Sequence, residues 1–213
     1  MRKQIAIAAS LVLTTLMTGV AQAQDSIGLT LAAGVIANAT PSPQEDFSEP
    51  VYLFSVQRVM KKHFVLEGDV NYWAHTSRHD RGPHDINGPS GVIGHVEGST
   101  EISDNSYLTL GFNFLVKSTG AVRVFAGAGL GLVMQDETFS QQHFGCSPSI
   151  PMVCNKFENH YDRAFPQFRL LGGVEVPVTS RLAIVGSARY ENQSWEETSR
   201  NVSAIAGVRF GLK

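Results

Sequence analysis

Two residues near the middle of the chain have the types and spacing of a nucleophilic pair. His75 and Ser77 stand two positions apart, which is the spacing of neighbours on one face of a β-strand. A serine nucleophile needs contact with its histidine and a third group that orients the ring. The H-x-S tripeptide also arises easily by chance at an ordinary strand end with polar residues. We therefore expect no enzyme and keep catalysis as an alternative.

Histidines gather in or beside two long polar stretches, residues 77–103 and 136–163. His79-Asp80 and His84-Asp85 place a ring beside a carboxylate, a combination that occurs around bound metal ions. No H-x-x-x-H spacing supports such a site, and histidines in loops are usually solvated. We expect no metal and no cofactor. The histidines concerned are His75, His79, His84, His95, His143 and His160.

The first 23 residues have the organisation of a secretory signal peptide. A basic start at Arg2-Lys3 precedes the uncharged apolar segment Ile5–Val20, and Ala21-Gln22-Ala23 is a small-residue cleavage site. The apolar segment is shorter than the ~20 residues that a spanning helix needs. We therefore expect residues 1–23 to be a signal peptide and residues 24–213 to be one exported domain.

The composition of the exported part excludes some partners. Without Arg2 and Lys3 the chain has 15 basic and 19 acidic residues, a balance that argues against nucleic acid. Export implies an oxidising compartment, so we predict a disulfide between Cys146 and Cys154. Closing so short a loop would contribute roughly 2–3 kcal/mol. A thiol metal site would need a further cysteine or histidine pair.

After residue 26, apolar and polar residues alternate in eight runs of about ten residues. Leu110, Phe112 and Phe114 share one face, opposite Gly111 and Asn113, and this period of two indicates a strand. The gaps between runs are alternately short and long, as in barrels that thread an outer membrane. We predict an all-β, eight-stranded antiparallel up-and-down transmembrane β-barrel. The runs are Ile27–Ala37, Val51–Met60, Phe64–Ala74, Tyr107–Val116, Val122–Leu132, Gln167–Val176, Leu182–Glu191 and Val202–Leu212.

One face of these runs is apolar, whereas the other carries opposite charges and many glycines. A soluble lipocalin-like barrel is the alternative, but a uniformly apolar face suits lipid, where a charge costs about 2–4 kcal/mol. Eight strands leave a lumen only wide enough for side chains. We therefore predict an interior closed by ion pairs rather than a porin-like pore. The predicted interior charges are Glu67, Asp69, Arg123, Arg169, Glu175, Arg189, Glu191 and Arg209.

On these features the chain resembles the small OmpA-like and OmpX-like outer-membrane β-barrels. The resemblance covers residues 24–213 and includes the last strand, Val202–Lys213, with outward Val208, Phe210 and Leu212. That strand is similar to the C-terminal signal read by the barrel assembly machinery, although the usual terminal aromatic residue is missing. The resemblance implies export through the periplasm to the bacterial outer membrane, in contact with its lipid and lipopolysaccharide.

Architecture of this kind does not fix a function. We expect a non-enzymatic structural or surface-interaction role, exerted through the loops 77–103 and 136–163 on an unidentified surface ligand. A passage protein for small hydrophobic solutes is an alternative, which an apolar lumen would favour and charged inner residues disfavour. A lipid A-modifying enzyme is a further alternative, because His75-Thr76-Ser77 resembles the histidine and serine of lipid A deacylases of this architecture.

Overall fold

The computed structural model describes residues 27–39, 48–61, 63–88, 91–145, 156–193 and 199–212. In this part of the chain every regular element is a strand, and no helix could cross a membrane. The predicted signal peptide and both cysteines lie outside the described residues. The strands are β1 (Ile27–Asn38), β2 (Ser48–Lys61), β3 (Phe64–Arg81), β4 (His84–Gly88), β5 (Gly91–Val96), β6 (Gly98–Lys117), β7 (Arg123–Phe144), β8 (Phe157–Pro177), β9 (Leu182–Gln193) and β10 (Ser199–Leu212).

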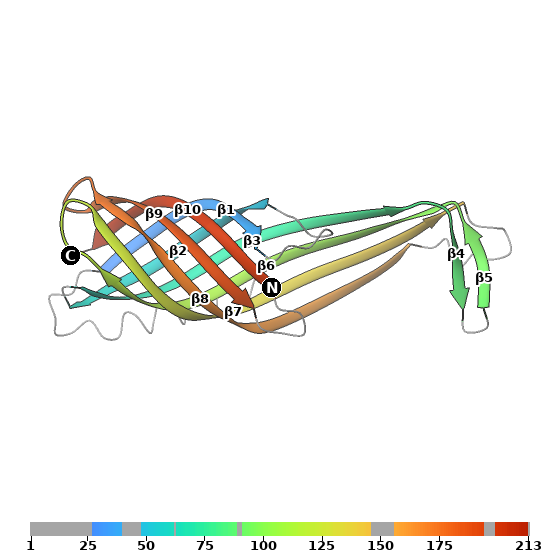
Figure 1. The fold of residues 1–213 in the computed structure, drawn as a ribbon, viewed down its shortest axis with the longest axis horizontal. Coiled ribbons are helices and arrows are strands. Elements are labelled where there is room, and N and C mark those ends of the chain that lie inside the picture. Colours follow the sequence, from blue (N-terminus) through green and yellow to red (C-terminus); the bar gives the residue numbers. More distant parts are fainter. Residues whose placement is uncertain are drawn as a thin grey trace. The chain divides into compact units, whose positions relative to one another are not determined.

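Eight of these strands close into a barrel (Figure 1). Their order around it is β1-β10-β9-β8-β7-β6-β3-β2, and β2 pairs with β1 to complete the ring. The pairing is antiparallel: Ile27 lies opposite Leu212 of β10 on one side and Arg58 of β2 on the other. The remaining strands, β4 and β5, form a separate two-stranded sheet. The predicted eight-stranded antiparallel barrel is confirmed.

Alternation along each strand decides which side chains face outward. In β6, Phe112 is 55% exposed and Phe114 47%, whereas Asn113 and Leu115 between and beyond them are buried. The same period of two continues around the barrel, because successive side chains of a strand point to opposite faces. The outward face therefore presents large apolar side chains, and the inward face receives the polar ones.

The chain divides into two compact units. The described residues of the barrel unit fall within 27–73, 107–134 and 164–212, and those of the strand-extension unit fall within 74–106 and 135–163. Strands β3, β6, β7 and β8 each contribute residues to both units.

The prediction that residues 77–103 and 136–163 are loops is wrong over much of their length. Strand β3 continues to Arg81 and β6 begins at Gly98, while β7 ends only at Phe144. These segments carry polar side chains on both faces, so the alternation that marks a half-buried strand is absent from their sequence. Backbone pairing continues nevertheless, and the β4–β5 hairpin lies within the first of the two stretches.

Candidate functional site

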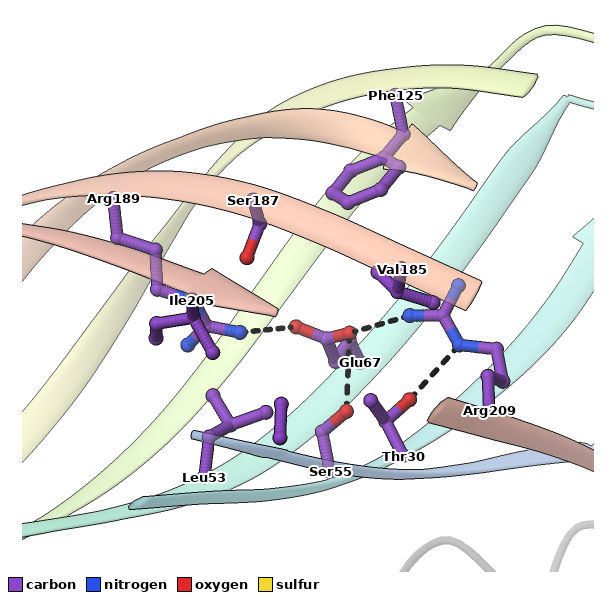
Figure 2. A pocket seen from close by; sticks show the side chains of 11 residues that line it. Thr30, Leu53, Ser55, Glu67, Phe125, Val185, Ser187, Arg189, Ile205 and Arg209 are labelled. Carbon is purple, nitrogen blue, oxygen red and sulfur yellow. Dashed lines mark hydrogen bonds and ion pairs between the residues drawn. The ribbon is translucent and has the colours of Figure 1, made fainter. Parts of the chain in front are cut away.

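A buried ion-pair network occupies the interior of the barrel unit. Asp69 accepts hydrogen bonds from Arg169 at 2.6 Å and from Arg189 at 3.0 Å. Glu67 accepts from Arg189 at 3.2 Å and lies 3.6 Å from Arg209 (Figure 2). Because a buried charge is tolerated only when it is paired, these contacts explain how four strands can place charges inside one barrel.

A second group of charges surrounds Glu175. Its carboxylate accepts from Lys117 at 2.7 Å and from Arg123 at 3.0 Å, and it also pairs with Arg209. Arg209 thereby joins this group to Glu67. Glu175 is therefore surrounded by three cations, of which Arg209 also meets Glu67 and Arg123 is partly exposed to solvent.

Neutral side chains complete the network. The amide of Asn113 donates to Asp69 at 2.5 Å and to Glu67 at 3.2 Å, so it holds two carboxylates at once. Arg169 also forms an ion pair with Glu191 at 3.1 Å. A Cβ atom at Gly111 would collide with the Arg169 guanidinium. The glycine is therefore required for the close approach of this arginine to β6.

Of the eight interior charges predicted from the sequence, seven are at most 5% exposed in the structure. Arg123 differs, because 41% of its side chain is exposed while it pairs with Glu175. Sequence reasoning missed Lys117, which is buried and bonded to Glu175. The signal was present, since Lys117 is two residues beyond Leu115 on the inward face of the same strand.

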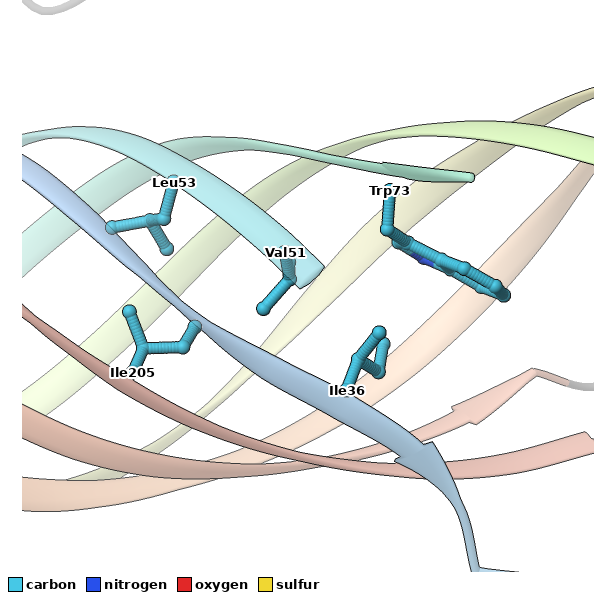
Figure 3. Packing of buried hydrophobic residues seen from close by; sticks show 5 residues of the cluster. All are labelled: Ile36, Val51, Leu53, Trp73 and Ile205. Carbon is cyan, nitrogen blue, oxygen red and sulfur yellow. The ribbon is translucent and has the colours of Figure 1, made fainter. Parts of the chain in front are cut away.

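Two apolar clusters also lie inside the barrel. One consists of Ile36, Val51, Leu53, Trp73 and Ile205 (Figure 3), and the Trp73 ring stacks on that of Tyr107 at 3.8 Å. The other consists of Val65, Leu115, Phe125, Leu171 and Val185. The register of β2 and β3 shows the order of these layers along the barrel. Along β3, the residues Glu67 and Asp69 lie between Val65 of one apolar cluster and Trp73 of the other. Glu67 and Asp69 are thus bracketed by apolar layers.

Little space remains among these layers. A cavity of about 10 Å³ lies beside Glu67, Ser187 and Arg189, bordered by Leu53 and Ile205 (Figure 2). That volume holds about one water molecule. Around this cavity, the ion pairs and the two apolar clusters fill the described interior of the barrel.

The strand-extension unit is held together by polar side chains. Thr76 donates to Asp104 at 2.7 Å, and Thr100 donates to Asp80 at 2.6 Å. The Thr100 hydroxyl and the Arg78 guanidinium lower the pKa of Asp80 below its usual value of 3.8. Both contacts are exposed to solvent.

Two edges of this sheet have no neighbouring strand among the described residues. Pairing between β2 and β3 ends at Val51 and Trp73, although β3 continues to Arg81. Pairing between β8 and β9 ends at Gln167 and Gln193, although β8 extends back to Phe157. A sheet edge without a neighbouring strand is a template for another extended chain.

The candidate residues for chemistry do not assemble into one site. His75 and Ser77 lie on β3, and the Ser77 side chain is exposed. The predicted His–Asp neighbours use other partners: the His84 ring bonds to the carbonyl of Gly82, and Asp85 bonds to His95 at 2.9 Å. Cys146 and Cys154 lie outside the described residues, so their disulfide stays a prediction.

Comparison with known proteins gives structural likeness only. No family model and no curated protein matches the sequence. Neisserial surface protein A, NspA, superposes with a TM-score of 0.51 at 15% identity, covering 88% of this chain and 97% of that one. Ail of Yersinia pestis, in complex with the heparin analogue sucrose octasulfate, gives 0.48 at 10% identity over 88% and 97%. The N-terminal β-barrel domain of Pseudomonas aeruginosa OprF gives 0.43 at 12% identity over 90% and 100%.

Proposed function

The chain has the fold of the small bacterial outer-membrane β-barrels, and we propose that it is a non-enzymatic surface-interaction protein that presents the strand-extension unit to a partner outside the membrane. The observation that carries the proposal is a pair of sheet edges, residues 76–81 of β3 and 157–166 of β8, where the described part of the chain places no neighbouring strand. The closed interior supports it, because a lumen filled by ion pairs and apolar layers offers no room for a substrate.

A free edge binds a partner by adding one strand to the sheet. Main-chain hydrogen bonds supply the affinity, and alternate side chains of the edge supply the specificity. The β3 edge carries Arg78, whose side chain is 63% exposed, and Arg81 at 56%. Each arginine already pairs with one carboxylate, Asp80 or Glu101, so we expect only a weak preference for acidic side chains in the extended peptide that binds this edge.

A phage-displayed peptide library panned on the full chain in lipid nanodiscs tests this role. We expect selected peptides to bind the unmodified protein at least tenfold more tightly than Ser77→Pro, because proline disrupts the β3 edge. Ala121→Pro, in the short turn between β6 and β7, is the matched control and should bind as the unmodified protein does. Equal binding to Ser77→Pro, or no peptide above background, would contradict the role.

Passage of small hydrophobic solutes is a second candidate, and the two apolar clusters inside the barrel favour it. Their side chains are packed against one another, so a solute would have to displace them. Planar-bilayer recordings address the lumen directly. We expect no large, steady conductance from the unmodified protein, and a steady open level would show a continuous water column.

A lipid A-modifying activity at His75 and Ser77 can be tested by mass spectrometry of lipid A. We expect identical spectra from cells that carry the unmodified chain and from cells that carry Ser77→Ala. A species that disappears with the alanine variant would establish the enzyme.

The proposal also includes processing and membrane contacts. We propose that residues 1–23 are removed, so that N-terminal sequencing of protein from the outer membrane begins at Gln24. The exposed apolar face would contact lipid and lipopolysaccharide, and the last strand, β10, would be recognised by the barrel assembly machinery. A mature protein that retains Met1 would contradict the cleavage.

A further inference from the structure

Three potential metal ligands come together on two neighbouring strands of the strand-extension unit. Asp136 lies on β7, and His160 and Asp162 lie on β8. One donor atom from each lies within 4.8 Å of the other two. The Oδ1 atom of Asp136 is 3.6 Å from His160 Nδ1, and that of Asp162 is 3.9 Å from His160 Nε2. We propose that these side chains form a site for a divalent transition-metal ion such as Zn²⁺.

The donor set determines which ions fit. Zinc is bound by imidazole nitrogen and carboxylate oxygen at about 2.0–2.2 Å, usually with four ligands in a tetrahedron. Tetrahedral donors at that bond length are about 3.4 Å apart. The three donor atoms lie within 4.8 Å of one another, so the side chains have to move closer together around the ion. An imidazole favours Zn²⁺ over Mg²⁺ or Ca²⁺, which prefer oxygen ligands. Three protein ligands leave a fourth position for water or an external ligand.

The surroundings of His160 suit a metal better than a simple ion pair. Both carboxylates lie beyond hydrogen-bond distance from its ring, whereas the Thr138 hydroxyl is 3.3 Å from Nδ1. One imidazole gives one nitrogen to one ion, so either Asp136 beside Nδ1 or Asp162 beside Nε2 has to shift toward the nitrogen that binds. Two like charges on adjacent strands repel each other unless a cation lies between them. The side chains of His160 and Asp162 are 57% and 76% exposed, so an ion can reach them from solvent.

The His95–Asp85 pair is the natural comparison. It lies in the same unit and is also exposed, but one carboxylate binds the ring directly at 2.9 Å. No second carboxylate joins this pair among the described residues. It therefore provides a histidine and an acid without the third ligand. No motif in the sequence marks the proposed site, because its ligands come from strands that are separated along the chain.

Calorimetric titration of the full chain in nanodiscs with Zn²⁺ tests the proposal. Cys146→Ser and Cys154→Ser are introduced in every sample so that thiols bind no zinc. We expect one equivalent of Zn²⁺, a loss of at least tenfold in affinity for His160→Gln and Asp162→Asn, and no loss for His95→Gln. Ca²⁺ should give no stoichiometric binding. Unchanged thermal unfolding shows that the variants are folded.

Absence of stoichiometric Zn²⁺ binding would overturn the site, as would unchanged affinity in His160→Gln. The test is separate from that of the surface-interaction role, because peptide binding at the β3 edge is measured without added metal. A negative result in one experiment therefore does not decide the outcome of the other.

Discussion

Strand β8 follows two different rules in the two units that it joins. In the barrel unit, Arg169 is 1% exposed while Phe168 and Leu170 on either side of it are 44% and 46% exposed. In the strand-extension unit, successive residues of the same strand, Asp162 and Arg163, are both exposed and polar. The backbone is equally extended in both. The difference shows that contact with lipid or with water, rather than strand formation itself, sets the alternation of side chains.

The largest expected difference in the free energy of unfolding is between two variants that each remove an arginine from an ion pair, one in the barrel unit and one in the strand-extension unit. Arg169→Met removes the arginine that pairs with the buried Glu191 and leaves Asp69 with Arg189 as its cationic partner, which should cost about 3–5 kcal/mol. Arg163→Met removes an arginine that is 55% exposed and 3.9 Å from Glu137, and it should cost less than about 1 kcal/mol. Urea unfolding in lipid vesicles measures both free energies of unfolding.

A double variant sharpens the first result. Arg169→Met combined with Glu191→Gln should cost less than the sum of the two single changes, because the residues share one interaction. Similar losses for Arg169→Met and Arg163→Met would mean that water reaches the interior network. The distinction between a closed barrel and a solvated sheet would then be wrong.

The next effect concerns the outward face. Phe112→Arg places a charge on the apolar face of β6, which should cost about 2–4 kcal/mol if the position lies near the bilayer midplane. Gln142→Arg, at an exposed position of β7 in the strand-extension unit, should fold normally. Folding yield into vesicles, measured by the heat-dependent shift in gel mobility, compares the two. Equal yields would reverse the assignment of the inward and outward faces.

Much of the barrel could be predicted because one physical constraint shaped its sequence. Lipid on one side and a crowded lumen on the other impose a period of two, which revealed the strands and the inward positions of Glu67, Asp69 and Arg169. The same alternation places Trp73 and Leu115 on the inward face, but it does not show that they pack into two apolar clusters. Charged residues identify the inward face of a strand, but they do not show which apolar residues on that face pack against one another inside the barrel.

The contacts within the network could not be predicted for a different reason. Which arginine meets Asp69 depends on the stagger of all eight strands, and that stagger is a property of the closed barrel. Asn113 is an example. The sequence pattern shows only that this small polar residue faces inward, whereas the structure shows that its amide donates hydrogen bonds to two carboxylates. The zinc ligands also come from two strands, so only folding brings Asp136 to His160.

A smaller effect is expected from the predicted Cys146–Cys154 disulfide. Exported protein should contain no free thiol without reductant, as measured with a thiol-reactive dye. Replacing both residues with serine should leave the barrel folded and lower its free energy of unfolding by at most about 2–3 kcal/mol, because the bridge would close only a short segment between β7 and β8. Two free thiols after export would contradict the disulfide, and loss of the barrel in the serine variant would contradict the independence of the two units.

The smallest effect concerns a single exposed carboxylate, Asp80. Hydrogen bonding from Thr100 and charge from Arg78 lower its pKa below 3.8, so the folded sheet binds this proton more weakly than the unfolded chain does. Its stabilising contribution is therefore present above about pH 4 and is lost as the pH falls through the lowered pKa. Carbon-13 NMR titration should show the pKa of Asp80 rising in Thr100→Val and staying unchanged in Thr138→Val, where the lost hydroxyl belongs to another contact. Because Asp80 is solvent-exposed, unfolding of the barrel should not follow this titration, and a barrel that loses stability in step with Asp80 would show the two units to be coupled.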